Sequence, residues 1–242
     1  MFNEFIQRKS ELFICLLYLI REVDPNSYLQ GRTKLQKCVY LLQNFLELTK
    51  NNQFEYKAGK FGPFSPELRT EVEYESVAGT ITIIENDKLN IYDDEITTNN
   101  TRYDHKLTEL HLNMIKEIFT SYPPDIKLLF YAVRNLSFYD AELIIGLIYN
   151  LFPKMTINSK ILPKIKGIPA HLIKKTAISF FRSLPYRLVK KIYDSNEYLR
   201  RILDITEITQ YKKIKNDKEE ENKIISKIIN ENMDLLKGIA EN

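Results

Sequence analysis

The stretch Phe61-Gly62-Pro63-Phe64-Ser65-Pro66-Glu67-Leu68 carries the strongest structural signal in this 242-residue chain. Gly62-Pro63 predicts a turn, because glycine tolerates positive φ and proline presets φ near about −65°. Ser65-Pro66 predicts a helix start, because a serine hydroxyl caps free N–H groups and proline leaves no N–H unpaired. We therefore expect a turn that leads into a helix over 66–77, which a left-handed glycine ends. The residues expected to define this turn and helix are Gly62, Pro63, Ser65, Pro66 and Gly79.

The residues on either side predict the rest of a small domain. Apolar side chains recur at helical spacing from Leu35 to Leu46, and another helix is expected over 5–23. Two β-branched runs at 80–84 and 88–92, separated by Glu85-Asn86-Asp87, predict a β-hairpin. The order helix, helix, turn, helix, hairpin is typical of a winged helix-turn-helix domain, with the helix at 66–77 in the position of the recognition helix.

These residues also resemble known proteins. The chain is similar to the YwgA-like group of small prokaryotic proteins and, more distantly, to the SocA-like (Panacea) antitoxin domain. Both have a K-L-Q-K … Y-L helix and a Y-G-P-[YF]-S turn, and this chain has Phe61 in place of the tyrosine. The resemblance spans roughly residues 30–92 and implies a winged-helix fold with a regulatory or toxin-neutralising role. It is carried by Thr33-Lys34-Leu35-Gln36-Lys37, Val39-Tyr40-Leu41-Leu42, Phe54-Glu55-Tyr56-Lys57, the stretch 61–68 and Ala78-Gly79-Thr80-Ile81.

Composition is that of a globular protein, with 44% apolar residues and 28% charged residues. The nine apolar residues at 12–20 are too few to span a bilayer, and no small-x-small cleavage site follows them. Cys15 and Cys38 lie in apolar helical runs, so we expect them to be reduced core residues. These features predict a cytoplasmic protein without a membrane partner.

Charge is distributed unevenly along the chain. Residues 154–215 hold 15 Lys and Arg against 4 Asp and Glu, whereas residues 1–153 hold 16 against 21. A polar run at 93–100 predicts a linker between the two regions. We therefore expect a winged-helix domain at 1–95, followed by a basic all-α domain at 105–242, and a chain that is mainly α with a small β-hairpin. Helices in the second domain are expected at 106–121, 123–135, 139–152, 171–184, 185–211 and 222–240.

The helix at 66–77 is acidic, which argues against major-groove reading, because carboxylates are repelled by phosphates. It is either a solvated helix that completes the domain or a surface that binds a protein partner, and direct reading of bases is the third alternative. The residues assigned to partner binding are Glu67, Arg69, Glu71, Glu73 and Glu75.

The basic segment alternates cationic and apolar residues, which predicts amphipathic helices with their charges facing solvent. Such helices are ordinary surface helices, bind a nucleic-acid backbone, lie on a membrane, or contact an acidic partner. A net charge of +11 over 154–215 favours a nucleic acid, DNA or RNA. The residues assigned to nucleic-acid binding are Lys174, Lys175, Arg182, Arg187, Lys190, Lys191, Arg200 and Arg201.

A smaller basic cluster, Arg32-x-Lys34-x-x-Lys37, opens the second helix. Its lysines are expected either to flank a buried stripe in solvent or to contact a phosphate at the helix N-terminus. The histidines, at 105, 111 and 171, do not have the spacing of a metal site, and no nucleotide-binding or nucleophile motif occurs. We therefore expect no catalytic residues, no metal and no cofactor.

Together these patterns predict a non-enzymatic regulatory protein. It would bind nucleic acid through residues 154–215 and a toxin or effector protein through its acidic N-terminal domain. The alternative is a structural adaptor subunit of a prokaryotic defence complex that does not bind nucleic acid by itself.

Overall fold

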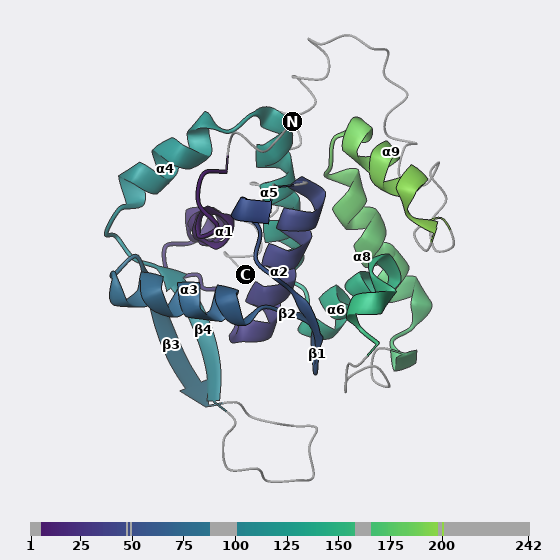
Figure 1. Ribbon diagram of the computed structural model, residues 1–242, viewed down its shortest axis with the longest axis horizontal. Coiled ribbons are helices and arrows are strands. Elements are labelled where there is room, and N and C mark those ends of the chain that lie inside the picture. The colour runs from purple at the N-terminus through teal and green to yellow at the C-terminus, as the bar shows by residue number, and fades with distance from the viewer. Residues whose placement is uncertain are drawn as a thin grey trace.

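The computed structural model describes residues 6–46, 48, 50–87, 101–157, 166–197 and 200. Over these residues the chain is mainly helical, with two small antiparallel sheets of two strands each (Figure 1). The mainly helical class expected from the sequence is thus confirmed. The elements are α1 (Glu11–Val23), α2 (Gly31–Leu46), η1 (Lys50–Asn52), β1 (Lys57–Gly59), β2 (Gly62–Phe64), α3 (Pro66–Val77), β3 (Ile81–Asp87), β4 (Thr101–Leu107), α4 (Leu112–Ser121), α5 (Pro124–Ser137), α6 (Ala141–Leu151), η2 (Pro153–Met155), α8 (Ala170–Arg182) and α9 (Tyr186–Ser195).

Helix α1 is the buried helix predicted from the apolar run, but it begins at Glu11 rather than near residue 5. The Glu11 carboxylate accepts hydrogen bonds from the backbone N–H groups of Gln7 (3.3 Å) and Arg8 (3.1 Å). These bonds hold the preceding residues in a turn, so the helix cannot extend towards the N-terminus. The Tyr122 hydroxyl also donates to this carboxylate at 2.7 Å and thereby ties α1 to the end of α4.

Helix α3 has the predicted bounds, and both of its ends form as expected. The Ser65 hydroxyl accepts a hydrogen bond from Leu68 N–H at 3.2 Å, and Pro66 is the first helical residue. Gly79 has a φ of 79° beyond the C-terminal end. The segment before the helix differs from the prediction. Gly62 has the expected positive φ of 83°, but it belongs to β2, which pairs with β1, and the chain turns at 60–61 instead.

The predicted hairpin has a different second strand and a different turn. Strand β3 pairs with β4 in a register that runs from Ile81↔Leu107 to Asp87↔Thr101. The predicted turn at 85–87 is therefore wrong, because these residues are in β3. The predicted strand at 88–92 lies outside the described residues, and the observed partner strand, β4, follows the predicted linker at 93–100 and overlaps the start of the helix predicted at 106–121.

Strand β4 was not predicted because some of its buried residues are polar. Asp104 is fully buried, and its carboxylate accepts a hydrogen bond from Gly31 N–H (2.8 Å) at the start of α2. A salt bridge of 2.8 Å to Arg102 also balances its charge. Backbone hydrogen bonds between His105 and Leu29 attach the strand to the segment before α2. Helix α4 consequently begins only at Leu112, not at residue 106 as predicted.

The core runs through the whole described part of the chain. Helix α1 packs against α4 and α5, α2 packs against α5 and α6, and α8 packs against α5 and α6. One buried apolar cluster includes side chains from all these helices, such as Leu16, Leu42, Phe130 and Phe181. The core therefore continues across the boundary that the sequence suggested near residues 95–105.

The later helices begin close to where periodicity and proline placed them, but the helix predicted at 185–211 is interrupted after Ser195, where Asn196 has an extended backbone. Helices α5 and α6 match the expected ranges within a few residues, and Pro185 separates α8 from α9 as predicted. Cys15 and Cys38 are both buried and free of a disulfide. Of the helices that the structure describes, none is long and apolar enough to cross a membrane.

Candidate functional site

The segment 33–37 of α2 is hydrogen-bonded directly to the stretch 61–68. Gln36 in α2 donates from Nε2 to the Ser65 carbonyl (2.9 Å) and accepts from Ser65 N–H through Oε1 (2.9 Å). Lys37 Nζ donates to the Pro63 carbonyl at 2.6 Å, and the Tyr56 hydroxyl donates to the Gln36 carbonyl at 3.0 Å. We call this set of contacts between Gln36, Lys37, Tyr56, Pro63 and Ser65 the α2 clamp. It holds β2 and the first turn of α3 in place.

Both expectations for the lysines of the Arg32-x-Lys34-x-x-Lys37 cluster are wrong. Lys34 and Lys37 are buried, so neither is solvated and neither faces a phosphate. Lys34 Nζ donates to the Ser137 carbonyl at 3.3 Å, as Lys37 does to Pro63. Burial lowers the pKa of both amines, and that of Lys37 falls to about 7, because desolvation disfavours the charged form.

Gly62 lies inside this clamp. A Cβ atom at this position would lie 3.3 Å from Lys37 Cε, 3.6 Å from a Thr156 methyl group and 3.8 Å from a methyl group of Ile145. With its φ of 83°, the position is also unfavourable for any residue with a Cβ. Gly62 is therefore required both by the backbone conformation and by the close approach of α2 and α6.

The five residues assigned to partner binding lie on α3 but are not equivalent. Glu67 is tied to the protein, because it pairs with Lys9 and accepts a hydrogen bond from Glu55 N–H at 3.2 Å. Arg69 and Glu73 are exposed and form an ion pair of 2.9 Å one helical turn apart. Glu71 and Glu75 are partly exposed. The accessible part of this surface thus has alternating charges rather than carboxylates alone.

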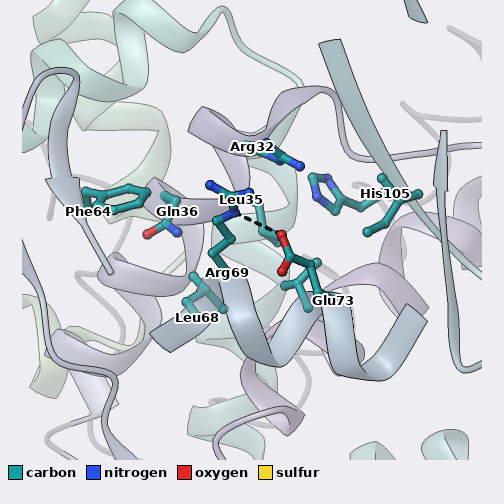
Figure 2. Close-up of a pocket in the computed structure, with 10 residues that line it drawn as sticks. Arg32, Leu35, Gln36, Phe64, Leu68, Arg69, Glu73 and His105 are labelled. Carbon is teal, nitrogen blue, oxygen red and sulfur yellow. Dashed lines mark hydrogen bonds and ion pairs between the residues drawn. The ribbon is translucent and has the colours of Figure 1, made fainter. Parts of the chain in front are cut away.

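A small cavity of about 30 Å³, open to solvent, lies between α2, α3 and the β3–β4 sheet. Apolar side chains form much of its lining, and polar groups from three elements reach it (Figure 2). Phe64, which is 40% exposed, lies at one end of it. The lining residues are Arg32, Leu35, Gln36, Phe64, Leu68, Arg69, Val72, Glu73, Ile83 and His105.

Two of the polar groups in the cavity have unusual surroundings. The Arg32 guanidinium stacks 3.5 Å from the centre of the Tyr103 ring and has no acidic partner among the described residues. His105 is only 1% exposed, and its Nδ1 atom has no hydrogen-bond partner in that part of the chain. Burial lowers the pKa of His105 to about 4; the nearby Leu29 carbonyl opposes this shift, and the Arg32 charge adds to it. The imidazole is therefore neutral at physiological pH.

Sequence reasoning missed this cavity. Arg32 was considered only with Lys34 and Lys37, and His105 only as a metal ligand. The pairing of β3 with β4 brings His105 opposite Ile83 and next to α2, and this pairing was not predicted. An alternating pattern at 101–107 was the one available signal, and two of its three buried residues, Asp104 and His105, are polar.

The basic helices α8 and α9 expose most of the cations assigned to nucleic-acid binding. Lys175, Arg182, Arg187, Lys190 and Lys191 are exposed, and Lys174 is partly buried. Phe180, Phe181, Leu188, Val189 and Ile192 form the buried faces of the same two helices. The predicted amphipathic arrangement is thus present, and the two phenylalanines are core residues.

Some of these cations also have partners within the protein. Arg187 pairs with Asp125 of α5, and Arg200 donates to the carbonyl of Asp194. Arg201 lies outside the described residues. In Figure 1, α8 and α9 lie on the side of the molecule away from α3 and the β3–β4 sheet. The two surfaces assigned from the sequence are therefore well separated.

Comparison with known proteins adds no further assignment. No protein-family model matches the chain, and no curated protein is significantly similar to it. In the described part of the structure, no cluster of three or more His, Cys, Asp or Glu side chains could hold a metal ion. Function must therefore be argued from the two surfaces and the cavity.

Proposed function

We propose that this is a regulatory protein of the winged-helix type that binds the backbone of DNA or RNA through α8 and α9. In this proposal the basic surface lies within residues 154–215, and the α3 side of the molecule binds a protein partner such as a toxin or effector. The protein acts by occupancy, without catalysis, metal or cofactor.

The observation that carries the proposal is the exposure of the cations on α8 and α9. The two helices contain six Lys and Arg residues and one acidic residue, Asp194. Their apolar faces pack into the core, so the charges remain on the outside. An excess of exposed positive charge attracts phosphates, and each phosphate contact releases a condensed counterion.

The winged-helix interpretation is supported by the order and packing of the first elements. Helices α1 and α2 pack together, and α3 follows and contacts β3 of the β3–β4 hairpin. Helix α3 would then occupy the position of the recognition helix. Its accessible residues include Glu73 and the apolar side chains of Tyr74 and Val77, the latter 90% exposed. Such a surface suits a protein partner better than a phosphate-lined groove.

The same exposed apolar residues favour one alternative, a structural adaptor that contacts proteins without binding nucleic acid. Both proposals include a partner at α3, and they differ in what α8 and α9 do. Binding of the isolated full-length protein to nucleic acid therefore separates them.

The test measures the affinity of the full chain for mixed-sequence DNA and RNA oligonucleotides over a range of salt concentrations. We expect the affinity to fall steeply with salt, with a slope of roughly −0.9 per phosphate contact on duplex DNA. The triple variant Lys175→Glu, Lys190→Glu, Lys191→Glu should lose at least about tenfold in affinity and have a shallower slope.

The matched control reverses three exposed lysines elsewhere, in the variant Lys50→Glu, Lys57→Glu, Lys116→Glu. It changes the net charge by the same amount, so a loss of affinity confined to the first variant assigns binding to α8 and α9. Equal affinity of the two variants, or no binding by the parent protein, would reject the proposed nucleic-acid interface and favour the adaptor.

A further inference from the structure

We propose that this protein associates head to tail with a second copy of itself. One contact surface, which we call the acidic face, consists of α3, the loop residues 109–110 and α4. The other, which we call the basic face, consists of α8 and α9. The inference rests on the proposed function in giving the α3 side a protein partner, and it names that partner as the basic face of another copy.

The acidic face has exposed apolar side chains at its centre. Tyr74 and Val77 lie one turn apart on α3, and Leu110 and Met114 lie at the start of α4; each is at least 47% exposed. A Cβ atom on Gly79 would lie 3.1 Å from Leu110 Cδ2, so Leu110 packs against the end of α3. Figure 1 shows the chain that leads into α4 beside that end of α3. Exposed apolar surface of this kind marks a site of protein contact.

Carboxylates surround these apolar side chains. The acidic face contains six glutamates against two cations, Arg69 and Lys116. Ion pairs within the protein offset three of the six glutamates. The other three, all at least partly exposed, are Glu71, Glu75 and Glu117. The face therefore keeps a net negative charge.

The basic face has the opposite charge and its own exposed apolar side chains. Helices α8 and α9 contain six Lys and Arg residues against Asp194, and one of the six pairs with Asp125. Leu172 and Tyr186 are exposed on the same two helices, at 38% and 43%. The two faces thus complement each other in charge, and each offers apolar side chains for another copy to cover.

The positions of the two faces make the contact intermolecular. They lie on opposite sides of the described structure, so one copy cannot join its own two faces (Figure 1). Because the faces differ, the pairing is heterologous, and the acidic face of one copy meets the basic face of the next. An occupied basic face is withheld from nucleic acid, so self-association would regulate the proposed binding.

The first experiment measures the sedimentation of the full chain, without nucleic acid, from about 5 to about 500 µM protein. We expect reversible association with a dissociation constant of about 10–100 µM at about 50 mM salt, as for a weak transient contact. Because salt screens exposed charges, the dissociation constant should rise at least about fivefold at about 500 mM salt. A monomer at every concentration, or association that salt does not weaken, would overturn the proposal.

The second experiment exchanges the charges of the two faces. The basic-face variant Lys175→Glu, Lys190→Glu, Lys191→Glu and the acidic-face variant Glu71→Lys, Glu75→Lys, Glu117→Lys should each stay monomeric up to about 500 µM. The variant that combines all six changes has complementary faces again and the parent net charge of +3, so it should regain association. A monomeric combined variant would overturn the proposal.

The matched control is Lys50→Glu, Lys57→Glu, Lys60→Glu, which alters exposed lysines outside both faces. It lowers the net charge as much as the basic-face variant does, and its dissociation constant should stay within about threefold of the parent value. Association that persists in the basic-face variant would indicate a different contact, such as one between two acidic faces, and would also overturn the proposal.

A single substitution tests the apolar centre of the acidic face. Val77→Ser should raise the dissociation constant at least about threefold, whereas Ile157→Ser, at an exposed apolar position outside both faces, should leave it unchanged. No effect of Val77→Ser would remove this end of α3 from the contact. Thermal unfolding checks that each variant is folded, and the salt series on the unmodified protein decides the matter if one is not. Because no nucleic acid is present, failure here is distinct from failure of the proposed nucleic-acid interface.

Discussion

The lysines of α2 and those of α8 and α9 have opposite surroundings. Lys34 and Lys37 are buried and donate to backbone carbonyls, whereas Lys175 and Lys190 are exposed. In the sequence both groups look like basic clusters on amphipathic helices. The difference shows that lysines in similar sequence patterns have two different roles. A buried lysine that donates to a backbone carbonyl supports the fold, whereas a lysine exposed to water contributes charge to the surface.

The two regions should therefore respond differently to substitution. In the α2 clamp, each polar side chain satisfies a backbone group that water cannot reach, so its loss should lower the free energy of unfolding. On α8 and α9, the charges are solvated, so their loss should change binding and leave stability nearly unchanged. The following predictions test this contrast, beginning with the largest effect.

Gln36→Leu should destabilise the protein most. It leaves the Ser65 N–H without a partner in a fully buried position and removes one of two hydrogen bonds to the Ser65 carbonyl, which keeps only the bond from Arg69 N–H at 3.4 Å. The unpaired N–H costs about 1–3 kcal/mol and the lost bond to the carbonyl about 0.5–1.5 kcal/mol, so we expect the free energy of unfolding in urea to fall by about 2–4 kcal/mol. Gln7→Leu, at an exposed position, is the matched control and should change it by less than about 0.5 kcal/mol. Similar values for both variants would contradict the clamp.

Gly62→Ala should have the next largest effect. The added Cβ would sit at a φ of 83° and 3.3 Å from Lys37 Cε, so we expect a loss of about 1–3 kcal/mol in urea unfolding. Gly167→Ala is the control, because its Cβ would meet no atom within 4 Å and its φ is not positive. That variant should be within about 0.5 kcal/mol of the parent. If Gly62→Ala were equally well tolerated, β2 would not be held as described.

Lys37 should make stability depend on pH. Its pKa is about 7 in the folded protein and ordinarily 10.5, so between these values the unfolded chain binds more protons. Stability should therefore rise with pH through this window, by up to about 1.4 kcal/mol per pH unit. The measurement belongs between about pH 7 and about pH 8.5, because buried Cys15 and Cys38, whose pKa is raised to about 12, act in the opposite direction above about pH 9.

The variant Lys37→Met should have a clearly smaller rise, since Lys34 is then the one buried lysine of α2 left with a lowered pKa. Lys190→Met removes an exposed lysine from α9 and should keep the slope of the parent protein. If Lys37→Met retained the slope of the parent in urea unfolding across this pH range, another group would be responsible. The pH dependence of stability would then no longer distinguish the buried lysine from the exposed one.

The smallest effect is expected on α8. Lys175→Met removes an exposed amine, so the free energy of unfolding in urea should change by less than about 0.5 kcal/mol. A Lys37→Met variant measured under the same conditions shows whether loss of the buried amine changes the free energy of unfolding more than loss of the exposed amine. A loss above about 1 kcal/mol for Lys175→Met would mean that this lysine also supports the fold, which would weaken its assignment to nucleic-acid binding.

Local signals in the sequence predicted the elements that local physics controls. The Ser65 cap, Pro66 and Gly79 set both ends of α3, and the apolar periodicities located α2, α5 and α6. Pro185 separates the basic helices α8 and α9 at the predicted position. The second strand of the hairpin was not predicted, because Asp104 and His105 read as polar loop residues although both are buried. Burial of Asp104 depends on Gly31 N–H, which is distant in the sequence, and on Arg102, which lies two residues earlier on the same face of β4.

By itself, the sequence determined the approximate positions of most helices, both ends of α3, the buried cysteines and the concentration of positive charge in the later helices. These follow from spacing and from residue chemistry within a turn or two of helix. The tertiary structure alone decided that Lys37 bonds to Pro63, that β4 pairs with β3, and that Arg32 meets His105 in a cavity. The physical reason is that a polar side chain is buried only when a partner from elsewhere in the chain satisfies its hydrogen bonds, and folding brings that partner to it.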